Sequence, residues 1–232
     1  MNWAKITDLT YLPDHECIED NLNQIEWDFK EILSFHEKHK FRSICTYPNY
    51  LPYTHISKPI NKISLVIDFP EGRKSAGMKL MQIGYSLATA KPYTYSSECD
   101  IVLSPDEPVV DLMMFDEAVV SEFIPFKVII GLCDRSEKEI IEIIKTIKCF
   151  GGARYIKTDT GRGKKVEFKE KLSRVKWLKA QMQENNLNIP MKISGGIRNT
   201  TEMKLLMQAT DENTIFGVSY SSLKEFPEFK SA

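Results

Sequence analysis

Eight short runs of apolar and β-branched residues recur along the chain, and this feature constrains the fold more than any other. Most of the intervals between them carry helical periodicity. Strands that alternate with helical segments are typical of βαβ units with a parallel sheet. The predicted strands are Lys5–Leu9, Arg42–Tyr47, Ile63–Phe69, Glu98–Leu103, Phe126–Leu132, Arg154–Thr158, Met191–Ser194 and Ile215–Val218.

Two of the intervals predict helices with a clear inner face, because their apolar residues recur every three or four positions. The second begins with a capping box formed by Ser136 and Glu139. Weaker periodicity predicts further helices within Met78–Ala88, Val109–Phe123, Phe168–Met182 and Glu202–Ala209. The inner face of the first helix is formed by Ile18, Leu22, Ile25, Phe29, Leu33 and His36.

Eight strand–helix units could close into a barrel or lie open as a doubly wound sheet, and periodicity does not choose between them. Polar residues at the ends of different predicted strands favour the barrel, whose active sites are assembled from strand ends. They include Asp8, Asp100, Lys157 and Lys192. The length of 232 residues also suits one barrel of about 250 residues. We therefore predict a single (β/α)8 TIM barrel, α/β in class, over residues 1–232.

The composition favours a small-molecule substrate. Lys and Arg (31) nearly balance Asp and Glu (32), so there is no global electrostatic case for nucleic acid or an anionic membrane. The five cysteines form no CxxC pair, which is typical of reduced thiols. The N-terminal residues lack a signal-peptide pattern, and no apolar run reaches the ~18 residues of a membrane helix. We expect a cytoplasmic protein and leave a homodimer open.

Two lysines stand within predicted strands. Lys157 follows an apolar pair in RYIKTDTG, and Lys192 lies in MKISGGIR. Burial or a neighbouring cation lowers the pKa of a lysine and leaves a nucleophilic amine, the form that condenses with a carbonyl. The alternative is a strand-end lysine whose ammonium extends to water. From spacing alone the two interpretations have equal weight.

Glycines after the same strands suggest a phosphate site. Gly195 and Gly196 precede a helix start, where backbone N–H groups favour phosphate, and Arg198 could add a charge-assisted contact. A glycine pair before a helix is more often only a tight loop. The basic loop from Gly161 to Lys165 could also hold phosphate, although a solvated loop is the commoner explanation.

Other polar residues allow two explanations each. Asp8 and Asp100 lie beside the first and fourth strands, where an acid is more often a helix N-cap or turn residue. Cys45 could be a thiol near the site, but a free cysteine is usually a small core residue. His36 and His39 have helical spacing without matching ligands, so we predict a solvated helix end and no metal site.

Taken together, these segments resemble the deoxyribose-phosphate aldolase family over almost the whole chain. The paired motifs YIKTDTG (155–161) and KISGGIR (192–198) are the most specific part of the resemblance. The remaining matches, in family order, are ITDLT (6–10), SICTYP (43–48), IDFPEG (67–72), ECDIV (98–102), FKVII (126–130) and FGVS (216–219).

The resemblance implies a class I aldolase that cleaves 2-deoxy-D-ribose 5-phosphate reversibly to acetaldehyde and D-glyceraldehyde 3-phosphate. It implies that Lys157 is the Schiff-base lysine and Lys192 the lysine that perturbs it. Asp100 becomes the acid of the proton relay and Asp8 a further active-site acid. Neither a metal nor another cofactor is implied. The implied substrate and phosphate contacts are Thr10, Cys45, Thr158, Gly161, Arg162, Gly195, Gly196, Arg198, Gly217 and Ser219.

The sequence departs from the family pattern at three positions near the site. Gly131 stands where the family usually has glutamate, Arg162 where it has lysine, and Tyr220 where a second serine is common. These changes leave both lysines and both acids in place. They keep two alternatives open: a related Schiff-base aldolase for another phosphorylated sugar, and a barrel that binds sugar phosphates without catalysis.

Overall fold

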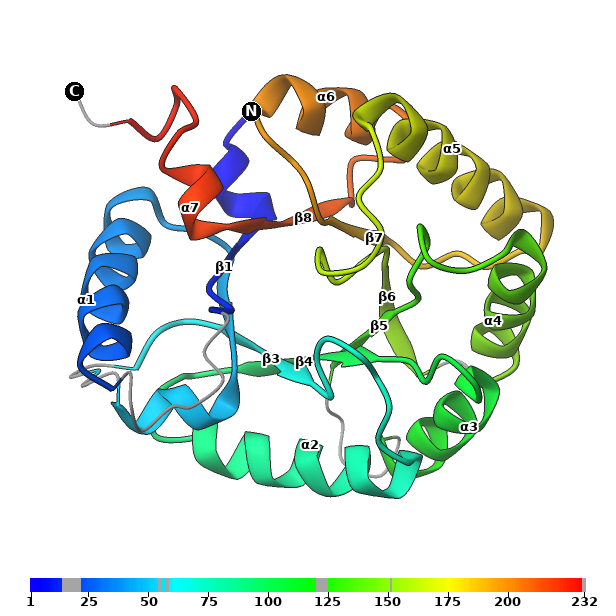
Figure 1. Cartoon of the computed structure of the whole chain (residues 1–232), viewed down its shortest axis with the longest axis horizontal. Helices are drawn as coiled ribbons and strands as arrows, with labels where there is room; N and C mark the ends of the chain where they lie inside the picture. Colours follow the sequence, from blue (N-terminus) through cyan, green and yellow to red (C-terminus); the bar gives the residue numbers. More distant parts are fainter. Residues whose placement is uncertain (14–21, 54–55, 57–58, 120–124, 151, 231–232) are drawn as a thin grey trace.

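The structure is a computed structural model that describes residues 1–13, 22–53, 56, 59–119, 125–150 and 152–230. Eight parallel strands form a closed barrel in chain order, and β8 (Ile215–Ser219) pairs with β1 (Thr7–Thr10) to complete the ring. Helices surround the ring on its outside (Figure 1). The predicted TIM barrel is confirmed, and the open doubly wound sheet is excluded.

The remaining elements alternate along the chain. The other strands are β2 (Ser43–Thr46), β3 (Ile63–Ile67), β4 (Ser97–Val102), β5 (Phe126–Ile129), β6 (Ala153–Lys157) and β7 (Met191–Ser194). The helices are α1 (Leu22–His39), α2 (Ala76–Ala90), α3 (Pro108–Val119), α4 (Glu137–Phe150), α5 (Phe168–Glu184), α6 (Thr200–Gln208) and α7 (Tyr220–Leu223). The described residues also include the 3-10 helices η1 (Trp3–Ile6) and η3 (Pro48–Tyr53).

The strand predictions differ from the structure mainly at their ends. The first strand begins at Thr7, because the preceding residues form η1 and the Thr7 hydroxyl donates a hydrogen bond to the Trp3 carbonyl at 2.8 Å. The fifth ends at Ile129 rather than Leu132, since the chain turns at Gly131 with a positive φ of 64°. Side-chain composition alone does not encode these local hydrogen bonds and turns.

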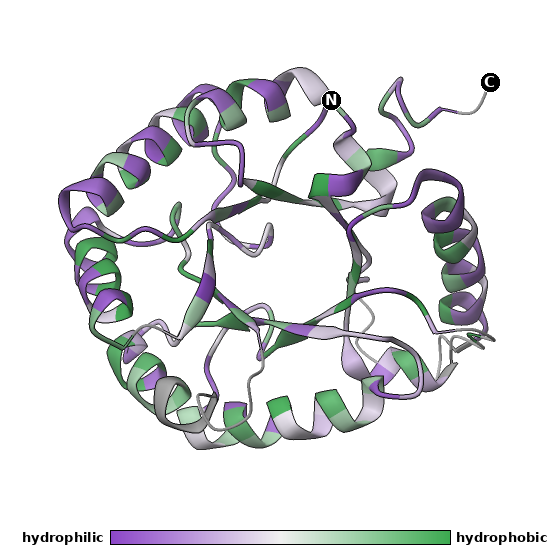
Figure 2. Cartoon of the chain, turned by 180° about the vertical axis from the view of Figure 1, so that it is seen from behind, coloured by the Kyte–Doolittle hydropathy of each residue, from purple (hydrophilic) through white to green (hydrophobic). Residues whose placement is uncertain are grey.

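The predicted inner faces of the two clearest helices are largely confirmed. Ile25 and Phe29 of α1 are buried, and Ser136 and Glu139 form the expected capping box at the start of α4. Ile18 and the last residues of the predicted helix ending at Phe123 lie outside the described residues. In Figure 2, hydrophobic and hydrophilic residues alternate along α1 and α5, as expected for helices with one covered face.

Of the two predictions for His36, its place on the inner face of the first helix is confirmed, and the solvated helix end was wrong. His36 is 8% exposed, and burial lowers the pKa of its imidazole. The neighbouring ring of His39 packs against Phe35 and Phe229, with ring centroids 4.7 and 5.2 Å apart. The contact with Phe229 comes from the far end of the chain, so the helical spacing could not reveal it.

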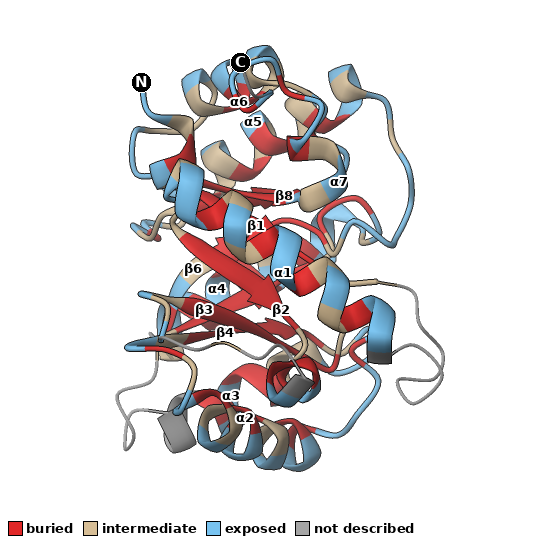
Figure 3. Cartoon of the chain, turned by 90° about the vertical axis from the view of Figure 1, so that its left-hand side faces the viewer, coloured by how far each residue is buried: buried red, intermediate tan, exposed pale blue. Residues whose placement is uncertain are grey.

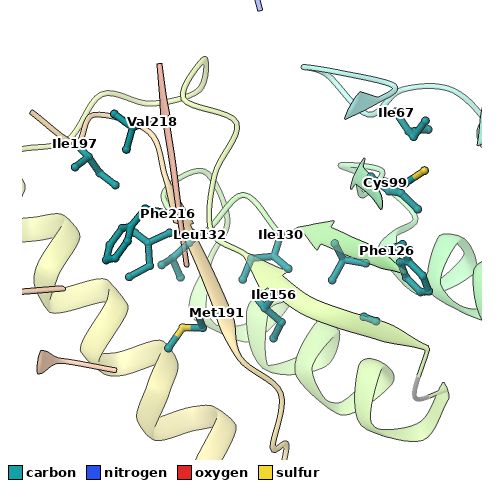
Figure 4. Packing of buried hydrophobic residues seen from close by; sticks show 14 of the residues in the cluster. Ile67, Cys99, Phe126, Ile130, Leu132, Ile156, Met191, Ile197, Phe216 and Val218 are labelled. Carbon is teal, nitrogen blue, oxygen red and sulfur yellow. The ribbon is translucent and has the colours of Figure 1, made fainter. Parts of the chain in front are cut away.

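The hydrophobic core lies between the strands and the helices, and Figure 3 shows the strands buried beneath helices whose outer residues are exposed. Because successive side chains of a strand point to opposite faces, one set faces the helices and the other faces the barrel interior. Figure 4 shows part of the outer set, including Ile156 of β6 and Met191 of β7. Their neighbours, Lys157 and Lys192, belong to the inner set.

Candidate active site

Lys157 and Lys192 meet inside the barrel, on the carboxylate of Asp100. The Nζ atom of Lys157 lies 2.8 Å from Asp100 Oδ2, and the Nζ atom of Lys192 lies 2.7 Å from the same oxygen. Both lysines are buried, at 3% and 0% exposure. Neither extends to bulk water, so the alternative of strand-end lysines with solvated ammonium groups is wrong.

Asp8 and Asp100 also lie in the barrel interior, and neither caps a helix. Asp8 Oδ2 lies 2.5 Å from Lys192 Nζ, and Asp8 Oδ1 accepts hydrogen bonds from Arg42 at 2.6 Å and Ser43 at 2.7 Å. Burial raises the pKa of Asp8, but Lys192 and Arg42 outweigh it and hold this pKa below its ordinary range. For Asp8 the more common explanation, a turn or N-cap residue, therefore fails.

A third lysine, Lys127 of β5, completes the cluster around Asp100. Its Nζ donates to Asp100 Oδ1 at 2.8 Å and to the Ser64 hydroxyl at 2.9 Å, and it also pairs with Glu98. Burial raises the pKa of Asp100, but Lys127, Lys157 and Lys192 hold it well below the ordinary value of 3.8. Asp100 is therefore an ionised carboxylate.

Sequence reasoning missed Lys127, although a signal was present. Lys127 stands one residue into an apolar strand run, as Lys192 does, and two positions before Ile129 on the same face of β5. Glu98 and Asp100 are likewise two positions apart on β4. A charged residue at an inward-facing position of a strand is the pattern that would have identified Lys127 and Glu98.

Cys45 lies beside this cluster rather than at the surface. Its Sγ is 3.9 Å from Asp100 Oδ2, and burial raises the pKa of the thiol. Across the described residues, no group of His, Cys, Asp or Glu side chains is placed to hold a metal ion. None of the described helices has an apolar stretch long enough to cross a membrane.

A cavity of about 170 Å³, here named the Lys157 cavity, opens beside the Schiff-base candidate. Phe69 forms one wall, and Lys157 Nζ lies 6.0 Å from its ring centre. The cavity brings together Lys157 and seven of the predicted substrate contacts: Thr10, Gly161, Arg162, Gly195, Gly196, Gly217 and Ser219.

Close contacts explain three of the four glycines that line this cavity, Gly161, Gly195 and Gly217. A Cβ atom at Gly195 would stand 3.1 Å from the Cα of Gly161, and both residues have φ near +80°. A Cβ at Gly217 would stand 3.0 Å from Cε of Lys192. Larger residues here would separate the loops or displace the lysine, and bare backbone leaves N–H groups free to face an anion.

The structure does not bring every predicted contact into the Lys157 cavity. Thr158 is buried between β6 and β7, where its Oγ1 accepts from the Ser194 N–H at 3.2 Å. Arg198 is exposed and lines a neighbouring cavity of about 280 Å³, which shares Gly161, Gly195 and Gly196 with the Lys157 cavity. Tyr220 points to α1, where its hydroxyl donates to Glu31 at 3.2 Å. Tyr220 therefore does not line the Lys157 cavity, whereas Ser219 and Ser222 do.

Comparison with known proteins places the chain in a family. No family model matches the chain. It is 30% identical over 204 residues to the deoxyribose-phosphate aldolase of Dictyoglomus turgidum, covering 84% of this chain and 85% of that protein. The chain belongs to the deoxyribose-phosphate aldolase family. The family's enzyme from Mycoplasmoides pirum is 27% identical over 97% of this chain and 98% of its own length.

Solved structures agree on the fold. A putative deoxyribose-phosphate aldolase from Coccidioides immitis matches with a TM-score of 0.72 at 22% identity, covering 94% of this chain and 81% of that one. The aldolase QR15 matches with a TM-score of 0.71 at 21% identity, covering 95% and 92%. At these identities the structural likeness supports the TIM barrel alone.

Proposed function

We propose that this family member is a class I aldolase that cleaves 2-deoxy-D-ribose 5-phosphate reversibly to acetaldehyde and D-glyceraldehyde 3-phosphate. One observation carries the proposal. A buried lysine, Lys157, lies 2.8 Å from an ionised carboxylate and lines a cavity edged by glycine loops. Family membership supports the same reaction.

Catalysis begins with the neutral amine of Lys157. Its nitrogen attacks the C1 aldehyde of the open-chain sugar, and the carbonyl oxygen leaves as water to give a protonated imine. Asp100, with a water, accepts the proton of the C3 hydroxyl. The C2–C3 bond then breaks, its electron pair moves toward the imine nitrogen, and D-glyceraldehyde 3-phosphate leaves. Protonation and hydrolysis of the remaining enamine release acetaldehyde and regenerate Lys157.

The charges around Lys157 suit these reaction steps. Lys192 and Lys127 keep Asp100 ionised, so it can accept a proton, and Asp8 holds Lys192 in place from the opposite side. The glycine loops offer backbone N–H groups to the phosphate at the other end of the sugar. The imine serves as the electron sink, so this route needs no metal.

Reductive trapping tests the proposal directly. Borohydride with acetaldehyde should fix a two-carbon adduct on Lys157, located by mass spectrometry of peptides. Lys157→Met should carry no adduct, while Lys138→Met, an exposed lysine of α4, should trap like the unaltered protein. An adduct on Lys192 instead would reverse the proposed roles. A folded protein that binds the sugar phosphate without trapping would favour the non-catalytic barrel.

A further inference from the structure

A second and larger cavity adjoins the Lys157 cavity, on the other side of β6. Its volume is about 350 Å³, within the range of small-molecule sites. Thr160 and Arg162 line both cavities, so the two are neighbours. We name this space the Arg135 cavity after the arginine of the β5–α4 loop that lines it.

The inner end of the Arg135 cavity is lined by β5, the strand next to the one that carries Lys157. Val102 and Ile129 line the cavity, and they pair in register across β4 and β5. Ile129 pairs in turn with Lys157 across β5 and β6. Paired residues of parallel strands share a face, so these three side chains all face the barrel interior. A group bound at this end of the cavity therefore lies one strand away from Lys157, which itself lines the neighbouring Lys157 cavity.

The cation that defines this cavity lacks a carboxylate partner. The guanidinium of Arg135 donates to the carbonyls of Pro105 at 3.2 Å, Leu103 at 3.2 Å and Ser104 at 2.6 Å, and to no carboxylate of the described residues. Burial lowers the pKa of Arg135, and nearby acids only partly offset it. A Cβ at Gly131 would lie 3.7 Å from Arg135 Nε and 3.9 Å from Asp134 Oδ2, so the missing side chain leaves room for a ligand beside Arg135, next to the Asp134 carboxylate.

The acids of the cavity are mostly engaged elsewhere. Glu139 Oε2 accepts from the Ser136 N–H at 2.8 Å and hydroxyl at 2.6 Å. Asp134 Oδ1 accepts from the Lys164 N–H at 2.7 Å, while its Oδ2 stays beside Gly131 in the lining. Glu71 is exposed at the rim. Arg73, also exposed, adds a second cation to the lining.

We propose that the Arg135 cavity holds a second anionic group of the substrate, so that the site also takes phosphorylated ketoses that carry an anion on each side of the carbonyl carbon. This rests on the proposed function, because it assumes that the carbonyl carbon is held by Lys157. An aldose has one carbon substituent on that atom, which extends toward the Lys157 cavity. A ketose has two, and the second would extend toward Arg135.

The test uses ligands that cannot react. D-glucitol 6-phosphate and D-glucitol 1,6-bisphosphate lack a carbonyl, so their binding by calorimetry does not depend on imine formation. The bisphosphate should bind roughly tenfold more tightly, as expected for one added charge-assisted contact. Equal affinities for the two ligands would overturn the proposal. Borohydride trapping in the same preparation tests the aldolase separately, so the failure of one proposal is distinguishable from the failure of the other.

A matched pair of variants tests the charge itself. Gly131→Asp places a carboxylate beside Arg135, and Gly131→Asn adds nearly the same volume without charge. Aspartate and asparagine both tolerate a positive φ better than most residues. The preference for bisphosphate should survive in Gly131→Asn and disappear in Gly131→Asp. Equal preference in the two variants would contradict an anion site.

A change at the rim keeps the proposal testable if the glycine variants fail to fold. Arg73→Gln removes an exposed cation of the lining and should reduce the preference for bisphosphate. Lys138→Gln, an exposed lysine of α4 outside the lining, is the control and should leave it unchanged. If Arg73→Gln keeps the full preference, the second anion does not bind here.

Discussion

The two faces of the barrel strands differ sharply in chemistry. The outer face packs against the helices through aliphatic and aromatic residues, while the inner face carries three buried lysines and three buried acids. Ile156 and Lys157 are adjacent on β6 and belong to these opposite environments. Apolar burial on the outer face stabilises the fold without directional demands. Buried charges need closely placed partners, so the inner face is specialised for chemistry.

The largest expected effect is the loss of catalysis in Lys157→Met. Methionine keeps the length of the side chain but has no amine, so neither the imine nor the adduct can form. Turnover should fall by at least about a thousandfold, which corresponds to an increase of roughly 4 kcal/mol in the activation free energy. Steady-state kinetics on 2-deoxy-D-ribose 5-phosphate measures this. A variant within tenfold of the unaltered rate would show that another group forms the imine.

A change on the outer face should lower the stability of the fold and leave imine formation intact. Ile156→Ala removes buried methyl groups between β6 and the helices and should lower the free energy of unfolding by about 2–5 kcal/mol. The fraction that remains folded should trap acetaldehyde on Lys157 as before. Urea denaturation gives the first quantity and borohydride labelling the second. Lost trapping in folded protein would mean that the two faces are not independent.

A smaller effect is expected from Lys192→Met, which removes one cation from the inner face. Lys192 lies between Asp8 and Asp100, whose carboxylates hold its pKa above the ordinary value. Loss of its positive charge should favour the charged form of the neighbouring amine. The variant should be slow, and the acid limb of its kcat/KM profile should move upward by about one to two pH units.

An unchanged acid limb in Lys192→Met would contradict this prediction. The role of Lys192 would then be limited to holding the two carboxylates in place. Lys179→Met is a suitable control, because Lys179 pairs with Asp211 on the outside of the barrel, 2.6 Å away. Its pH profile should match that of the unaltered protein.

The smallest effect concerns stability at low pH. Asp8, Glu98 and Asp100 have pKa values below their ordinary values, so the folded state binds fewer protons than the unfolded chain. Their contribution is complete above the unfolded pKa values near 4 and declines as the pH falls below them. The free energy of unfolding should decrease from pH 5 to pH 3, measured by urea denaturation. A flat profile would contradict the ionised inner face.

Patterns within the sequence were sufficient to predict the architecture and the central pair of lysines. Eight strand runs separated by helical periodicity predicted βαβ units with a parallel sheet, and the polar residues at several strand ends favoured the barrel over the open sheet. The motifs around Lys157 and Lys192 predicted the residues that meet on Asp100. Local patterns carry this information, since each depends on neighbouring residues only.

The grouping of polar side chains in the barrel interior became apparent only in the folded chain. Lys127 joins Asp100 because β5 lies beside β4, and Arg42 reaches Asp8 and Glu98 across the barrel interior. The same closure places Arg198 outside the Lys157 cavity and opens the Arg135 cavity at Gly131. These contacts join residues distant in sequence, and barrel closure sets their distances, so no local pattern could predict them.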